Sequence, residues 1–133
     1  MLKPSLVRIS SMVLCIAAGS ACAQVNIDSL RAIATDTNRP DSVRFTAYYD
    51  LVWDGYLFSE PDTAFELGRK LQREAKARNN NVFVARANEL MAASCYVRGD
   101  MRKALLHYDT ALTQHKKNGD DDGYADVITN MAG

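Results

Sequence analysis

A period of forty residues runs through most of this 133-residue chain. Shifting the sequence by forty positions superposes Ala64 on Ala104 and Tyr56 on Tyr96. Three positions recur in three successive units, namely Leu51, Met91 and Met131; Val52, Ala92 and Ala132; and Phe45, Ala85 and Ala125. Periods of roughly 20 to 50 residues are typical of proteins in which one supersecondary unit stacks on the next. The period therefore predicts a stack of similar units.

Within each unit the apolar residues have the spacing of an amphipathic helix. Two stretches per unit follow the i, i+3, i+4, i+7 pattern, which places side chains on one helical face. The first stretches contain Tyr48, Leu51, Val52 and Gly55, and then Asn88, Met91, Ala92 and Cys95; the second contain Ala64, Phe65, Gly68 and Leu71, and then Ala104, Leu105, Tyr108 and Ala111. Because small residues let helices cross closely, we expect each unit to be a pair of antiparallel helices.

Capping residues and turn formers divide the chain at the expected helix ends. Asp41 and Ser59 are expected to cap the first two helices, because short polar side chains accept hydrogen bonds from the first helical N–H groups. Gly99 is expected to end a helix and Asp100 to cap the next one. Clusters of Asn, Gly and Asp, which form turns, separate the units at 79–81 and 118–120.

The second unit resembles a tetratricopeptide repeat, which consists of two helices. The matching residues are Ala85, Met91, Ala92, Cys95 and Tyr96 in the first helix, and Gly99, Asp100, Ala104, Tyr108, Ala111 and Leu112 in the second. The forty-residue period resembles a lengthened form of the usual repeat of about 34 residues. The resemblance covers residues 45–133 and departs from the motif at Asn88, where Trp is frequent, and at Cys95, where Tyr is frequent. It implies an all-α fold, namely an antiparallel helix-pair solenoid (a TPR-like superhelix). The repeats would lie at 41–80, 81–120 and 121–133, and the last of them would be incomplete.

Residues 1–23 have the pattern of a signal peptide. A basic start at 1–8 is followed by an apolar stretch at 12–18 and by an A-x-A cleavage site at 21–23, which would make Gln24 the mature N-terminus. The apolar stretch is shorter than the roughly 20 residues that span a bilayer, which disfavours an uncleaved anchor. A lipid on Cys22 is the other alternative. We expect an exported protein, located in the periplasm or associated with the cell envelope of a bacterium.

A leading helix and linker are expected in residues 24–40, before the repeats. One helical face would be formed by Ile27, Leu30 and Ile33, with Asp28 or Asn26 as the cap. The expected role of this helix is to cover the open side of the first repeat. The sequence stops inside the first helix of the third unit, whereas solenoids usually need about three repeats and a polar terminal unit. We therefore expect a longer protein, or a partner that covers the last helix.

Sixteen basic and sixteen acidic residues give the chain a formal net charge of zero. No overall field favours nucleic acid or an acidic membrane. The basic run at 69–78 is interpreted as a solvated helix face, because nearby glutamates and the helix C-terminus balance its charge. We expect no nucleic-acid partner. Contact with a membrane is expected only through a lipid on Cys22 or through a transmembrane helix beyond residue 133.

The concave side of such a stack is the expected binding surface. In a curved stack the first helix of each unit lines this side. Its outward faces carry the candidate ligand-binding residues, which are Tyr49, Trp53 and Tyr56 in the first unit and Arg86, Glu89 and Tyr96 in the second. Aromatic and Arg side chains are good anchors for a peptide or protein. The alternative for Tyr49 and Trp53 is that they pack beneath the leading helix.

No catalytic, cofactor or metal constellation can be assembled from the sequence. His107 and His115 are expected at the surface or groove edge, and Cys95, the only thiol left after cleavage, on a packing face. The acids at 120–122 are consecutive and lack the alternation of a calcium loop, so capping of the next helix explains them better. We therefore expect no enzyme activity, no metal and no cofactor.

Two functions follow as expectations. The first is an exported interaction module that binds a protein or peptide through its concave face. The alternative is the periplasmic sensor region of a longer membrane signalling protein, such as a histidine kinase, a nucleotide cyclase or a transcription regulator. In that case the output domain would lie beyond residue 133.

Overall fold

The computed structural model describes residues 27–133, and within this part of the chain every regular element is an α-helix. A helical segment at 27–35 is followed by five helices, which are α2 (Asp41–Gly55), α3 (Pro61–Ala77), α4 (Asn81–Val97), α5 (Met101–Asn118) and α6 (Asp121–Ala132). The expectation of an all-α fold is confirmed. The predicted leader at 1–23, the alternative lipid on Cys22 and the alternative cap Asn26 lie outside the described residues.

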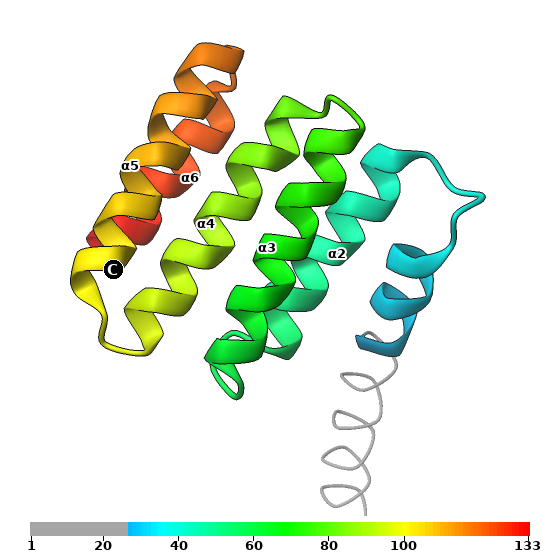
Figure 1. The fold of residues 1–133 in the computed structure, drawn as a ribbon, viewed down its shortest axis with the longest axis horizontal. Coiled ribbons are helices and arrows are strands. Elements are labelled where there is room, and N and C mark those ends of the chain that lie inside the picture. Colours follow the sequence, from blue (N-terminus) through cyan, green and yellow to red (C-terminus); the bar gives the residue numbers. More distant parts are fainter. Residues whose placement is uncertain (1–26) are drawn as a thin grey trace, which may run out of the picture.

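Successive helices pack side by side in the order of the chain (Figure 1). α4 is the central helix, because it contacts α2, α3, α5 and α6. Helices α2, α4 and α6 lie next to one another in that order, while α3 contacts both α2 and α4, and α5 contacts both α4 and α6. Among the helices of the described part, none is long and apolar enough to cross a bilayer.

The helices begin at a regular interval. α2, α4 and α6 begin at Asp41, Asn81 and Asp121, which are forty residues apart. α3 and α5 begin at Pro61 and Met101, with the same separation. The sequence period therefore recurs in the starting points of the helices.

Three of the helix starts are capped by side chains. The side-chain oxygens of Asn80, Asp100 and Asp120 accept hydrogen bonds from backbone N–H groups in the first turns of α4, α5 and α6. Asp100 was the predicted cap of its helix, and Asp120 acts as the acid cap expected for the 120–122 cluster. Gly99 follows α4 with a φ of +82°, a left-handed conformation that glycine adopts without strain and that commonly ends a helix.

The predictions for the caps of the first two helices are wrong. Pro40 is the N-cap of α2, and Asp41 lies inside the first turn. Its carboxylate instead pairs with Arg44 and Arg78, at 3.4 Å in each case. Glu60 is the N-cap of α3, where Pro61 at the first helical position sets the start of the helix. Ser59 remains in the preceding turn.

The helices pack closely against one another at the small residues, as the sequence predicted. Ala64 and Ala104 are buried, and a Cβ added to Gly68 would lie 3.1 Å from Cγ of Met91, so α3 and α4 are tightly apposed there. Leu105 is an exception to the predicted packing face, because 55% of its surface is exposed. It follows Ala104 by one residue, or about 100° around α5, and this rotation turns it away from α4.

The leading helical segment packs against α2. Ile27 lies beside Gly55, and Leu30 and Ile33 line a pocket together with residues of α2 such as Val43. The three residues that were predicted to share a face therefore all lie on the side of the segment that faces the first long helix. The segment also carries an exposed ion pair between Asp28 and Arg31.

Candidate functional site

Three of the six predicted site residues meet in one pocket on the α2–α4–α6 side. Tyr49 and Trp53 come from α2 and Arg86 from α4. The pocket has a volume of about 350 Å³, and its remaining lining residues are Asp50, Asp54, Asp126, Thr129 and Asn130. It thus draws side chains from three helices whose starts are forty residues apart.

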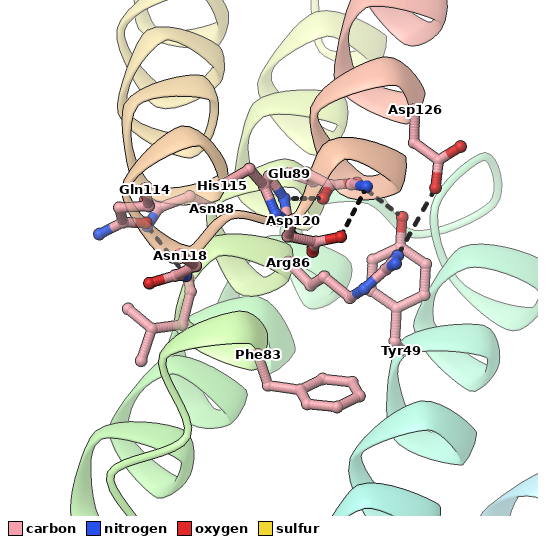
Figure 2. Close-up of polar contacts among 12 residues, drawn as sticks. Tyr49, Phe83, Arg86, Asn88, Glu89, Gln114, His115, Asn118, Asp120 and Asp126 are labelled. Carbon is pink, nitrogen blue, oxygen red and sulfur yellow. Dashed lines mark hydrogen bonds and ion pairs between the residues drawn. The ribbon is translucent and has the colours of Figure 1, made fainter.

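The aromatic and basic side chains of this pocket hold one another in place. The rings of Tyr49 and Trp53 are stacked, with centroids 5.9 Å apart and an angle of 18° between their planes. The guanidinium carbon of Arg86 lies 5.6 Å from the centroid of the Tyr49 ring, and its Nη1 lies 3.8 Å from Oδ2 of Asp126 (Figure 2). Arg86 is therefore already engaged on two sides by the protein.

A second, more apolar pocket adjoins the first. Its volume is about 230 Å³, and Trp53 and Asn130 line both pockets. The rest of its lining is Leu57, Phe58, Ala93, Tyr96, Val97, Tyr108 and Gly133. We call the two pockets together the groove. The pocket around Arg86 is its polar end, and the pocket around Tyr96 is its apolar end. Tyr96, a predicted site residue, is 46% exposed there.

The polar end carries more acidic than basic side chains. Asp50, Asp54 and Asp126 face a single basic residue, Arg86. Partial burial raises the pKa of the Asp50 carboxyl, the charge of Asp54 raises it further, and Arg86 only partly opposes these effects. Asp50 and Asp54 are spaced four residues apart around Trp53, so the sequence did contain a signal for this acidic flank.

Tyr56 is not part of the groove. Its hydroxyl oxygen accepts a 3.4 Å hydrogen bond from Nη2 of Arg31, in the leading helical segment. Tyr49 and Trp53, for which packing beneath the leading helix was the alternative, line a pocket with residues of α4 and α6. It is thus Tyr56 that contacts the leading segment. Tyr56 lies just beyond the last residue of α2, so its side chain does not continue the helical face that carries Tyr49 and Trp53.

Glu89 does not face a ligand either, since its side chain is completely buried. Its Oε2 accepts a 3.1 Å hydrogen bond from the hydroxyl of Tyr49. Its Oε1 lies 2.6 Å from Nε2 of His115, whose Nδ1 lies 2.9 Å from Oδ2 of Asp120 (Figure 2). We call Glu89, His115 and Asp120 the buried polar cluster. It links α4, α5 and the turn before α6, and through Tyr49 also α2.

The surface position expected for His115 is therefore wrong, and the reason lies in the tertiary structure. Both ring nitrogens face carboxyl groups that lie outside α5, so the sequence of α5 contains no motif that predicts these contacts. The pKa of Glu89 is raised by burial, against the effect of the His115 hydrogen bond. The pKa of Asp120 is lowered, mainly because its carboxylate accepts a hydrogen bond from the N–H of Gly123.

Within the described residues, the side chains of Cys95 and His107 are also part of the packing. Cys95 is buried as predicted, and its sulfur accepts a 3.3 Å hydrogen bond from Arg98. His107 is half-buried, with Nδ1 3.3 Å from Oδ1 of Asn88, and burial lowers its pKa. Across residues 27–133, no group of three or more His, Cys, Asp or Glu side chains converges in a way that could hold a metal ion.

Comparison of the chain with protein-family models, with curated proteins and with solved structures finds no match.

Proposed function

We propose that this chain is a binding module that holds a peptide, or an extended segment of a protein, in the groove along α2, α4 and α6. The observation that carries this proposal is the shared position of Trp53, which lines both the polar and the apolar end. Two adjoining pockets of different polarity suit a chain ligand with successive side chains of different chemistry.

The chemistry of the lining supports binding over catalysis. The groove is lined by aromatic and aliphatic side chains, aspartates, one arginine, an asparagine and a threonine. Tyr and Trp anchors remove large areas from water at a small cost in side-chain entropy, and this is why they are frequent at interfaces. The proposed anchors are Trp53, which lines both pockets, and Tyr96, which lines the apolar end.

We propose further that the helices form an antiparallel helix-pair solenoid similar to tetratricopeptide repeats. Equivalent positions of successive units contact each other, which supports this arrangement. Tyr49 bonds to Glu89, and Arg86 pairs with Asp126, each across forty residues. In such a stack the groove would be the concave face. Export, which the leader at 1–23 predicts, would place this face in the periplasm or cell envelope.

The proposal can be tested with a library of random octapeptides selected against the immobilised 133-residue chain. Trp53 is the only tryptophan, so its fluorescence reports directly on occupation of the groove by a selected peptide. We expect saturable quenching or a spectral shift of Trp53. We also expect Tyr96→Ala to weaken binding roughly tenfold or more, as loss of an interface anchor does.

Tyr124→Ala provides the matched control. Tyr124 is 39% exposed, similar to Tyr96, but it lies on α6 away from both ends of the groove. This variant should bind selected peptides as the parent chain does. The proposal is wrong if no peptide is enriched, or if both tyrosine variants lose binding to the same extent.

A further inference from the structure

Two carboxylates at the polar end of the groove have no basic partner in the described part of the chain. Within residues 27–133, Asp50 and Asp54 form no ion pair with a Lys, Arg or His side chain, whereas Asp126 is paired with Arg86. Both unpaired carboxylates lie on α2, one helical turn apart, and both line the same pocket. The local charge is therefore negative even though the chain as a whole is neutral.

No free basic side chain of residues 27–133 balances this charge. Arg86 is the only basic residue of the pocket, and it is held by the Tyr49 ring and by Asp126. Burial and the neighbouring Asp54 both raise the pKa of Asp50, so ionisation of this carboxyl is opposed in the free protein. A cation placed between Asp50 and Asp54 would relieve that opposition.

An aromatic surface lies beside the two carboxylates. Trp53 stands between Asp50 and Asp54 in the sequence, lines the same pocket, and is stacked on Tyr49. Indole is the side chain that attracts cations most strongly through its ring face. Carboxylates together with an aromatic ring are the surroundings in which a guanidinium or ammonium group is bound well.

The adjoining pocket favours a different side chain. Phe58 is 76% exposed and Tyr96 is 46% exposed, although both are large and aromatic. They line the apolar end with Val97 and Tyr108, next to Trp53. Burial of these side chains by an apolar group would favour binding, because it removes exposed apolar surface from water.

We propose that the ligand of the groove is a peptide that presents an Arg or Lys side chain to Asp50, Asp54 and Trp53 and an apolar side chain to the apolar end. This inference rests on the proposed function and specifies its partner, a basic–apolar peptide. Charge complementarity selects the basic residue, and the exposed aromatic side chains select the apolar one.

The test begins with the octapeptides enriched by the full chain. Arg or Lys should be enriched at one position, with Leu, Ile, Phe or Met at a position close to it. One enriched peptide is then synthesised in two forms, with Arg and with its neutral isostere citrulline. The Arg form should bind roughly threefold to tenfold more tightly, as expected for partly exposed ion pairs combined with a cation–π contact. Added salt should reduce this difference.

The double variant Asp50→Asn, Asp54→Asn should abolish the preference for Arg but leave binding of the citrulline peptide within about twofold of the parent chain. Retained citrulline binding shows that the variant is folded. Asp109→Asn is the control, because Asp109 is exposed on α5 and lines neither end of the groove. It should preserve the preference.

The outcomes separate the two proposals. If no peptide binds, the proposed function fails, and this inference fails with it. If peptides bind in the groove without enrichment of Arg or Lys, or if the double variant keeps the Arg preference, the proposed function stands and the inference about the partner is overturned.

Discussion

His115 Nε2 lies 2.6 Å from Glu89 Oε1, and neither side chain is accessible to solvent. The two residues belong to different helices, α5 and α4, and the second ring nitrogen of His115 faces Asp120 in the turn before α6. A buried ion pair can be neutral or even costly relative to an apolar pair, but the loss of one partner leaves an uncompensated polar group. The consequences for stability can be measured.

His115→Ala should destabilise the fold by about 3–5 kcal/mol, because it leaves the buried carboxyl of Glu89 with only the hydroxyl of Tyr49 as a partner. Urea unfolding followed by circular dichroism measures this change. The control is His107→Ala, since His107 is only half-buried, makes one side-chain hydrogen bond, at 3.3 Å to Asn88, and packs edge-on against the ring of Phe65. The control should lose clearly less stability. Equal losses of unfolding free energy in both variants would show that the buried polar cluster contributes no more to stability than the contacts of His107.

Acid should weaken the fold partly through Asp120. The pKa of this carboxyl is lowered in the folded state, so the unfolded chain takes up its proton at a higher pH, near the ordinary value of about 3.9. The stability from this group is thus present above that value and is lost as the pH falls through the lower folded pKa.

Asp120→Asn removes this titration but keeps a good capping side chain. The variant should therefore show a shallower loss of stability below about pH 4 than the parent chain, in urea midpoints measured between pH 2 and 6. Parallel curves for the two proteins would contradict the assigned role of Asp120.

Gly123→Ala should destabilise the fold by about 1–3 kcal/mol. A Cβ at this position would overlap the imidazole of His115 and the carboxylate of Asp120, which are held by the buried polar cluster and cannot easily move. Gly55→Ala serves as the comparison, because an added Cβ would make ordinary contacts there, at 3.5 Å to Ile27. That substitution should stabilise α2 by up to about 1 kcal/mol through helix propensity. Thermal denaturation should show opposite signs for the two variants.

Phe58→Ser should weaken peptide binding while changing stability by less than about 0.5 kcal/mol. The side chain is 76% exposed, so the fold gains little from it, but it lines the apolar end of the groove. Leu106→Ser is the matched change on α5, where Leu106 is 63% exposed and lines neither end. Trp53 fluorescence titrations with an enriched peptide should separate the two. Unaltered affinity in the Phe58 variant would remove the apolar end from the binding surface.

Local features could be read from the sequence because their causes are local. The cap formed by Asp100 and the helix end at Gly99 depend on neighbouring backbone groups within a few residues. The corresponding predictions for Asp41 and Ser59 failed where a proline moved the start of a helix by one residue. Tyr49, Trp53 and Arg86 were identified as candidates from helical spacing, and they do meet in one pocket.

The period and the helical spacing of the apolar residues predicted an all-α chain built from helix pairs. In the structure, α2 to α6 start twenty residues apart, and equivalent helices start forty residues apart. Only the tertiary structure decided that Glu89 is buried, because its partners Tyr49 and His115 lie forty and twenty-six positions away and come from different helices. α4 is covered by helices on both sides, so even some of its polar residues, namely Asn88, Glu89 and Ser94, are removed from water. The helical pattern of the sequence predicts that a charged side chain such as Glu89 is exposed to solvent. Whether it can instead be buried depends on hydrogen-bonding partners from distant segments, and only the tertiary packing brings these partners close.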